Sequence, residues 1–344
     1  MNKKTHVAKC PGCGADMLYD PKSQGLLCPY CDGKKEIEKA PAPKKDFYAE
    51  RTNSVTDKQS YKYVCPNCGG EIDFESYVTA TKCPFCSATN IVKEQPVGGL
   101  SPDGVLPFLF TKEMAMEAGQ KWIKKKVFAL GTFKKNFKTD NLKGMYVPSY
   151  IFASKTYTKY TARLGKTYTT GSGKNRRTHT RWFTVSGDFA RDFSNVLVEA
   201  TRHLTQSEIQ KINPFDLANL VAYKQEYVAG FEAERNDESL DQGFLKAKDV
   251  MQEIIKREVL SKYTYDVVGS FNADVSYNDI GFNYALVPIW MFSCKYKDKE
   301  YRYIVNGRTG RSYGKYPLSP AKVASVVLFA LGVLALFVYL YLQG

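Results

Sequence analysis

Cysteine spacing is the feature of this sequence that points most directly to chemistry. Eight of the nine cysteines form four Cys-x-x-Cys pairs, and the pairs make the same unit twice at a distance of 55 residues. Two residues between cysteines let one tight turn aim both thiolates at one ion, and two such turns complete a tetrahedral site. The predicted metal ligands are Cys10, Cys13, Cys28, Cys31, Cys65, Cys68, Cys83 and Cys86.

Zinc is the metal that this ligand set favours. Iron in a rubredoxin-like site is bound by the same two Cys-x-x-Cys turns, so iron is kept as an alternative. A disulfide framework would need an oxidising compartment, and the N-terminal sequence MNKKTHVAKC has no apolar run that could act as a signal peptide. Each unit is too small to bury a hydrophobic core, so we expect the bound ion to stabilise its fold in place of a core. We therefore expect two structural Zn²⁺ ions with no open coordination position.

A C-terminal apolar segment predicts a membrane span. Residues 323–342 contain no charge, and twenty helical residues cover about 30 Å, the thickness of a bilayer core. Basic residues precede the segment and none follows it, which places the preceding side in the cytoplasm by the positive-inside rule. We expect a single-pass tail anchor in the cell membrane, with the N-terminal body cytoplasmic.

Composition shifts divide the chain into five parts. We expect a first zinc ribbon over residues 1–34, a charged, Ala-Pro-containing linker over 35–60 that lets the ribbons move independently, a second ribbon over 61–95, a cytosolic body over 96–320 and the anchor over 321–344. The body mixes strands and helices without regular βαβ alternation. That pattern favours an α+β fold with an antiparallel sheet, as one domain or two.

Several elements of the body can be placed from local pattern. Thr111 can cap a helix that runs to about Lys126, and a longer helix is expected over 239–260. Threonine, tyrosine and valine dominate 144–199, with a turn near 170–175, which predicts a long hairpin. Further strands are expected over 265–277 and 284–296, and Asn306-Gly307 favours a short hairpin turn.

No residue pattern indicates catalysis. The three histidines, His6, His179 and His203, stand in no metal-binding or catalytic motif, and Cys294 has no histidine near it in sequence to activate it. Gly165-Lys166-Thr167 lacks the earlier glycine that a phosphate-binding loop requires. We expect a protein that is not an enzyme.

One stretch of positive charge could bind a partner. The sequence has no acidic residue between Asp140 and Asp188, and strand alternation would place many of its cations on one side of the hairpin. The candidate contact residues are Lys166, Lys174, Arg176, Arg177 and Arg181. A solvated face, anionic lipid headgroups, and nucleic acid or an acidic protein are the three interpretations.

The order of these parts resembles a family. The eight paired cysteines are followed by the segments at 144–150 (GMYVPSY), 286–290 (LVPIW) and 305–310 (VNGRTG), then Gly314, Pro317 and the span. This is similar to bacterial tail-anchored double zinc-ribbon membrane proteins, often labelled transcription factor IIB-type zinc ribbon or primosomal-protein-like. The resemblance implies partners of the phage-shock coiled-coil, flotillin-like or virion-core-like type and a part in envelope stress.

Together these patterns predict a non-enzymatic adaptor that recruits cytosolic proteins to the inner face of the membrane. A membrane-tethered nucleic-acid-binding protein is the alternative, with the ribbons or the basic hairpin as its contact surface.

Overall fold

The structure is a computed structural model that describes residues 8–51, 61–64, 71–74, 78–82, 89–91, 102–137, 142–201, 204–234, 236, 238–296 and 299–343. Strands and helices alternate irregularly along the chain, and most strand pairs are antiparallel. The expected α+β class is therefore confirmed.

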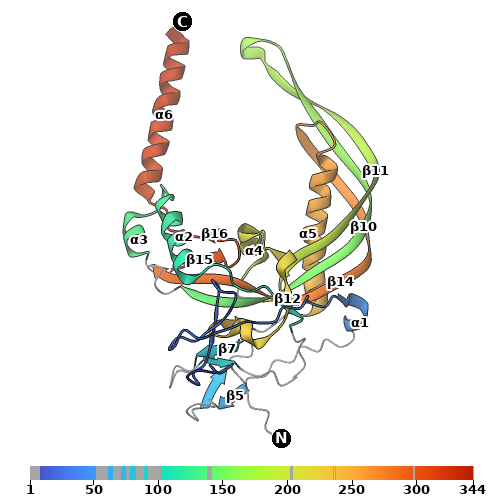
Figure 1. Ribbon diagram of the computed structural model, residues 1–344. Coiled ribbons are helices and arrows are strands. Elements are labelled where there is room, and N and C mark those ends of the chain that lie inside the picture. The colour runs from blue at the N-terminus through green and yellow to red at the C-terminus, as the bar shows by residue number, and fades with distance from the viewer. Residues whose placement is uncertain are drawn as a thin grey trace.

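Three long strands form the centre of the body (Figure 1). β10 (Lys143–Thr170) lies between β11 (Arg177–Glu199) and β14 (Val267–Tyr296) and is antiparallel to both. The β10–β11 pairing continues to the turn, whereas the β10–β14 pairing ends at Gly165 opposite Val267. The last part of the hairpin therefore extends as two strands alone. The two strands expected over 265–296 are one continuous strand.

Eight shorter strands complete a sheet of eleven among the described residues. They are β4 (Lys45–Asp46), β7 (Val78–Lys82), β8 (Thr89–Ile91), β9 (Gly104–Val105), β12 (Val221–Ala222), β13 (Glu232–Glu234), β15 (Lys299–Asn306) and β16 (Ser312–Gly314). β9 is parallel to β14, and β13 is parallel to β10. Two smaller sheets consist of β1 (Leu18–Asp20), β2 (Gly25–Leu27) and β3 (Lys34–Lys35), and of β5 (Tyr61–Val64) and β6 (Glu71–Phe74).

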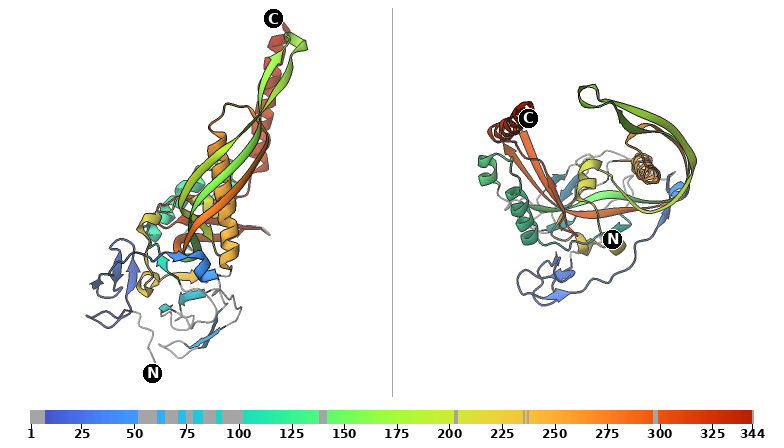
Figure 2. Two further views of the ribbon diagram at one scale, coloured as in Figure 1. Left: turned by 90° about the vertical axis from the view of Figure 1, so that its right-hand side faces the viewer. Right: turned by 90° about the horizontal axis from the view of Figure 1, so that it is seen from above.

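Helix α5 (Leu240–Leu260) lies along the concave side of the three long strands, which curve around it (Figure 2). Ser239 and Gln242 form a capping box at its N-terminus, where the sequence predicts the helix to begin. Its buried side includes Phe244, Ala247 and Met251, which pack against aromatic residues of the sheet. The predicted helix and its apolar stripe are confirmed.

Two of the remaining helices are longer, α2 (Lys112–Lys124) and α6 (Pro320–Gln343). The shorter ones are α1 (Phe47–Arg51), α3 (Gly131–Asn136), α4 (Gln206–Ile212) and the 3₁₀ turns η1 (Gly173–Asn175), η2 (Leu217–Asn219) and η3 (Gln225–Val228). Thr111 caps α2 as expected, and its side chain accepts a hydrogen bond from the Met114 amide at 3.3 Å.

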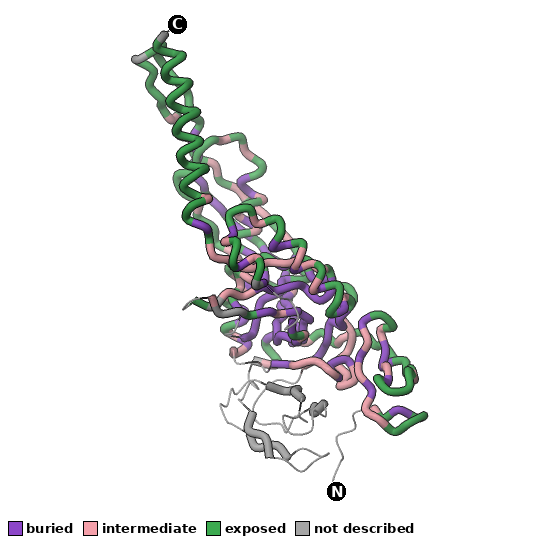
Figure 3. Tube along the Cα trace, turned by 90° about the vertical axis from the view of Figure 1, so that its left-hand side faces the viewer, coloured by how far each residue is buried: buried purple, intermediate pink, exposed green. Residues whose placement is uncertain are grey.

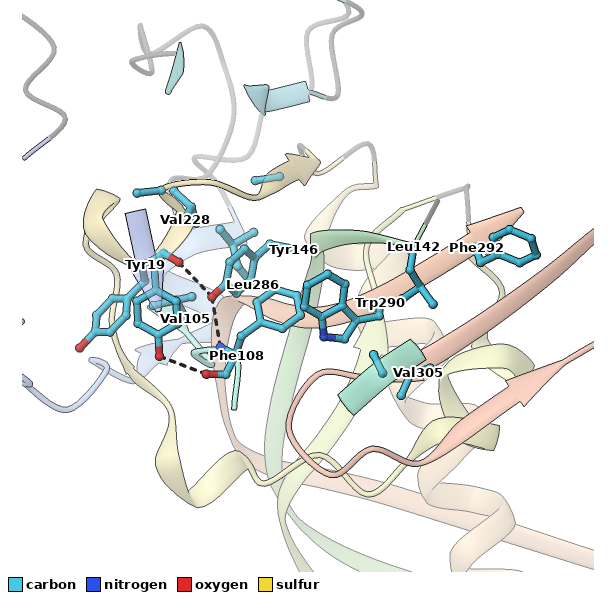
Figure 4. Close-up of a cluster of buried hydrophobic side chains, with 14 of the residues drawn as sticks. Tyr19, Val105, Phe108, Leu142, Tyr146, Val228, Leu286, Trp290, Phe292 and Val305 are labelled. Atoms are coloured by element: carbon cyan, nitrogen blue, oxygen red, sulfur yellow. Dashed lines mark hydrogen bonds between the residues drawn. The ribbon is translucent and has the colours of Figure 1, made fainter. Parts of the chain in front are cut away.

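Aromatic rings fill the core on the side of the sheet where the chain begins (Figure 4). The Phe108 ring stacks on Phe231 at 4.2 Å between centroids and lies 5.1 Å from both Tyr146 and Trp290. The Tyr146 hydroxyl donates to the Tyr227 carbonyl at 3.1 Å and accepts from the Phe108 amide at 3.3 Å. Phe108 is thus fixed by rings on three sides and by its own backbone.

The turn expected at Asn306-Gly307 is wrong in its length. β15 ends at Asn306 and β16 begins at Ser312, and the positive φ falls at Gly310 (71°). A Cβ on Gly307 would lie 2.6 Å from the Phe108 ring, so this glycine permits close packing of the loop on the core. The Asn306 side chain accepts from the Arg308 and Thr309 amides and holds the longer loop.

Helix α6 and the β10–β11 hairpin project from the same side of the body (Figures 1 and 2). Residues along α6 are exposed over its length (Figure 3), and no part of its apolar stretch is buried against the body. α6 is long and apolar enough to cross a membrane. Among the described residues, the first four-cysteine unit lies at the opposite end of the molecule from the hairpin tip (Figure 1).

Close packing of α5 on β10 gives a stability prediction. A Cβ at Gly243 would lie 2.4 Å from the Tyr150 ring, whereas a Cβ at Gly131 in α3 meets nothing within 4 Å. We expect Gly243→Ala to destabilise the protein by about 1–3 kcal/mol through overpacking. Thermal unfolding of the detergent-solubilised protein measures the effect. Gly131→Ala is the matched control and should be neutral or slightly stabilising; equal behaviour of the two variants would contradict this packing.

Candidate metal centre and cationic hairpin

The first four-cysteine unit forms a single cluster of thiols. The Sγ atoms of Cys10, Cys13, Cys28 and Cys31 all lie within 4.8 Å of one another. Cys10 and Cys31 are 3.4 Å apart at sulfur, as are Cys13 and Cys28. A disulfide needs about 2.05 Å, whereas a tetrahedral site with Zn–S bonds of about 2.3 Å places its sulfurs ~3.8 Å apart. The four residues fit a tetrahedral metal ion.

Tight turns aim these thiols inward. The Gly14 amide donates to the Cys10 carbonyl at 2.9 Å, and the Asp32 amide donates to the Cys28 carbonyl at 3.1 Å. The sequence predicts a glycine with positive φ at such a turn, and Gly14 has φ of 74°. In the second knuckle, Asp32 takes the corresponding left-handed conformation with φ of 59°.

The electrostatics of the cluster favour a bound cation. The Cys13 and Gly12 backbone amides lower the pKa of the Cys10 thiol to about 6. The Gly33 amide acts in the same direction on Cys31, but the neighbouring thiols outweigh it and raise the pKa of Cys31 to about 12. The backbone therefore supports thiolate, while crowding of four sulfurs prevents all of them from ionising without a compensating positive charge.

The first ribbon is packed into the body. The Tyr19 hydroxyl donates to the Phe108 carbonyl at 3.1 Å, and the Tyr19 amide donates to the Ala229 carbonyl at 3.0 Å. The Gln24 side chain donates to the same Phe108 carbonyl at 2.7 Å. Buried ribbon residues, among them Met17 and Leu26, share one hydrophobic cluster with Phe108 and the rest of the aromatic core. Independent movement of this ribbon, which the linker led us to expect, is wrong.

The part of the predicted linker that the structure describes explains this. Ala40 accepts a backbone hydrogen bond from Ala222 at 2.7 Å, and β4 pairs with Gly281 and Phe282 of β14. Lys45 forms an ion pair of 2.8 Å with Asp103, whose side chain is buried. Residues 40–46 therefore lie on the body surface as ordered backbone.

The second four-cysteine unit lies mainly outside the described residues. Cys65, Cys68, Cys83 and Cys86 are not among those described, so the second predicted metal site stays a prediction. The backbone of β7, which lies between its two cysteine pairs, joins the large sheet by pairing with β13.

The structure places three of the five predicted basic residues on one face of the hairpin. Lys166 lies directly opposite Arg181, and Arg177 lies opposite Thr170 four residue pairs further along the register. Opposite residues in an antiparallel ladder point to the same side. Arg176 is exposed beside the turn, and the Lys174 side chain lies outside the described residues. Lys166 and Arg181 form a like-charge cross-strand pair, which weakens a hairpin unless an anion binds to it.

An aromatic pair lies between these cations. The Tyr168 and His179 rings stack at 5.5 Å between centroids, and the two residues are also directly opposite in the register. Trp182 and Arg163 belong to the other face, where the guanidinium lies 5.0 Å from the indole ring centre. The first face therefore combines cations with an exposed stacked pair of rings.

Compensating charge is found near the base of the hairpin. Lys155 forms an ion pair of 2.9 Å with Asp279, and Lys159 lies opposite Asp188. Where the two-stranded part begins, the Asp266 carboxylate accepts from the Thr167 amide at 2.7 Å, a hydrogen bond that lowers the pKa of this carboxyl. Beyond that point the sequence of the hairpin from 167 to 187 has no acidic residue, so we call residues 166–181 the cationic arm.

The sequence gives no signal for a cavity that the structure shows in the body. A cavity of about 680 Å³ lies between α4 and α5, with Lys246, Asp249, Glu253 and Arg257 in its wall. The Lys246 ammonium pairs with Glu199 at 2.8 Å and Glu238 at 2.6 Å. Burial raises the pKa of Glu199, and this ion pair opposes the rise. Through these ion pairs, Lys246 links α5 to the end of β11.

Of the other residues considered for chemistry, His179 lies in the cationic arm, whereas His6, His203 and the Cys294 side chain lie outside the described residues.

Comparison with known proteins finds a relative that is similar over most of the chain. The uncharacterized protein YdjG of Bacillus subtilis (strain 168) is 29% identical over 318 residues, which cover 92% of each chain. No protein-family model matches the chain, and no solved structure matches it significantly. The similarity therefore extends over most of both chains.

The shared core of ribbon and body predicts that metal and fold are coupled. We expect Cys28→Ser to remove one of two zinc ions by elemental analysis. It should also lower the thermal midpoint of the whole protein by several degrees, at about 2–4 °C per kcal/mol. Tyr30→Ala is the matched control, because Tyr30 lies in the same knuckle but is exposed. Iron as the main metal, or an unchanged midpoint after metal loss, would contradict the prediction.

Proposed function

We propose that this protein is a non-enzymatic adaptor that α6 anchors in a membrane and that presents its zinc ribbons to cytosolic proteins. The observation that carries the proposal is the combination of a thiol cluster packed into the body with a bare apolar helix at the other end. A helix that buries nothing against its own body needs another apolar medium. Two zinc ions in the two units, with structural roles, belong to the same proposal.

The distribution of basic residues supports a cytoplasmic body. Arg308, Arg311, Lys315 and Lys322 precede the apolar stretch, and no charged residue follows Lys322. This asymmetry corresponds to the positive-inside rule. Four free thiols at one site agree with a reducing compartment.

An exposed aromatic residue supports protein binding by the ribbon. Tyr30 lies between the second pair of cysteines and is 81% exposed. Tyrosine is over-represented among residues that contribute most to interfaces, and the sequence places Phe85 at the corresponding position of the second unit. Partners of the phage-shock coiled-coil, flotillin-like or virion-core-like type, and a part in envelope stress, follow from the family resemblance.

The recruitment test separates the anchor from the ribbon surface. Proteins captured with the tagged full chain should be found in the membrane fraction. When the membranes are washed at high salt, which weakens contacts between exposed cations and lipid, removal of residues 321–344 should move both the body and these proteins to the soluble fraction, because α6 buries no core. Tyr30→Ala should keep its zinc and lose the captured proteins. A truncated chain that stays in the membrane fraction, or capture that Tyr30→Ala leaves unchanged, would oppose this part of the proposal.

The cationic arm is proposed to contact anionic lipid headgroups. It projects on the same side of the body as α6 (Figures 1 and 2). Its charged side chains and open strand edges cannot enter the hydrocarbon, so the arm must lie against the surface. Within the described chain, the hydrogen bonds between α6 and the rest of the body lie at its first turn, and the proposal requires the helix to turn beyond that point so that one bilayer plane meets both.

Nucleic acid is the second candidate for the arm, and the exposed Tyr168–His179 stack is the observation that favours it. Aromatic rings beside cations stack on bases and bind phosphates in single-stranded nucleic acid. In this alternative, the anchor tethers a nucleic-acid-binding surface to the membrane.

Vesicles and DNA compared at equal salt distinguish the two ligands. We expect the chain without α6 to bind anionic vesicles, and to lose about 100-fold or more in affinity when Lys166, Arg176, Arg177 and Arg181 become glutamine, at about 1 kcal/mol per cation. Binding should weaken with salt. The control changes Lys34, Lys35, Lys39 and Lys44 to glutamine, which removes equal charge at the other end of the molecule. Arm-dependent binding of DNA without vesicle binding would favour the alternative. Binding of neither would favour the third interpretation, in which the arm is a solvated face without a partner.

A further inference from the structure

A second surface on the membrane side surrounds the base of α6. The loop between α2 and α3 packs against the residues that lead into the helix. The Ser319 amide donates to the Phe128 carbonyl at 2.8 Å, and the Leu130 amide donates to the Pro317 carbonyl at 3.0 Å. Ala129 and Leu318 form a β-bridge. This loop and the start of α6 are therefore one structural unit.

Apolar side chains of this unit point away from the body. Val127 is 69% exposed, Leu318 is 58% exposed, and Phe128 is also exposed. Ala129 between them is fully buried and holds the loop on the core. Three exposed apolar side chains that adjoin an uncovered apolar helix form one continuous apolar surface.

Lysine residues surround this apolar surface. The sequence has no acidic residue between Glu117 and Asp140, or after Glu300. Lys124, Lys125 and Lys315 are exposed, and the Lys126 ammonium lies 5.3 Å from the Trp122 ring centre and 5.9 Å from that of Tyr316. Positive charge is thus concentrated where the chain enters α6.

Lys322 fixes the depth of the loop relative to the helix. Its ammonium donates to the Val127 and Ala129 carbonyls, both at 3.0 Å. The loop therefore lies at the level of the first turn of α6. Because a headgroup layer is about 5–8 Å thick on each side of the hydrocarbon, a loop hydrogen-bonded to that turn falls within the layer.

We propose that residues 124–128 and 315–322 form a membrane collar that lies in the interface of an anionic bilayer. Val127, Phe128 and Leu318 enter between the lipids, and Lys124, Lys125 and Lys315 bind lipid phosphates. Apolar and aromatic side chains beside lysine are the composition that this interface favours. The collar rests on the proposed membrane anchoring by α6, and its continuity with α6 identifies lipid as its occupant.

Tryptophan placed in the collar tests this directly. The full chain with Val127→Trp is incorporated into phosphatidylcholine–phosphatidylglycerol vesicles, with and without lipids brominated on the acyl chains. We expect bromine to quench most of the added fluorescence, after subtraction of the signal from the three native tryptophans. Tyr48→Trp is the control, because Tyr48 is similarly exposed but lies in α1, away from α6; its added signal should stay unquenched.

Flotation of the vesicles separates failure of the collar from failure of the anchor. A chain that does not float with vesicles overturns both the anchor and the collar. A chain that floats but shows equal quenching at positions 127 and 48, or none at 127, overturns the collar alone. Phe128→Trp provides a second position in case Val127→Trp lowers the yield of folded protein. Quenching at 127 or 128 with none at 48 supports the collar.

Discussion

The rest of the structure depends on the pairing of β10 along both of its edges. This 28-residue strand pairs with β11 along one edge and β14 along the other. Where all three strands are present, they provide a curved surface that α5 covers. Where β14 and α5 end, the same two strands continue into solvent as the cationic arm. One backbone arrangement thus creates both the surface on which α5 packs and the exposed cationic arm.

Phe108 connects this sheet to the metal centre. Its ring packs among Tyr146, Phe231 and Trp290 of the body, while its carbonyl accepts from Tyr19 and Gln24 of the first ribbon. A four-cysteine unit alone has almost no hydrophobic core. Here the body supplies that core, and the segment that carries the four cysteines covers part of the aromatic cluster. A ribbon held in this way presents Tyr30 in a fixed position rather than on a flexible tether.

Charge is separated along the molecule in a way that complements its apolar surfaces. Cations near the base of the hairpin have acidic partners, such as Lys155 with Asp279. Those on the arm and around the start of α6 lie in stretches of sequence without acidic residues. An exposed cation remains hydrated and therefore adds little free energy in water, whereas an anionic surface attracts it. Both places are on the side of the body from which α6 projects.

The sequence by itself determined the elements whose signals are local. The spacing of Cys10, Cys13, Cys28 and Cys31 predicted that these thiols lie together as ligands of one metal ion, Ser239 and Gln242 defined the start of α5, and an uncharged segment of twenty residues defined α6. Only the tertiary structure decided how these parts meet. Linker composition predicted free movement of the first ribbon, but long-range hydrogen bonds from Tyr19 and Gln24 fix it, because the energy of that contact lies in residues 80 or more positions away. The same holds for the loop at Val127, whose position beside the first turn of α6 follows from its hydrogen bond with Lys322 and has no local signal.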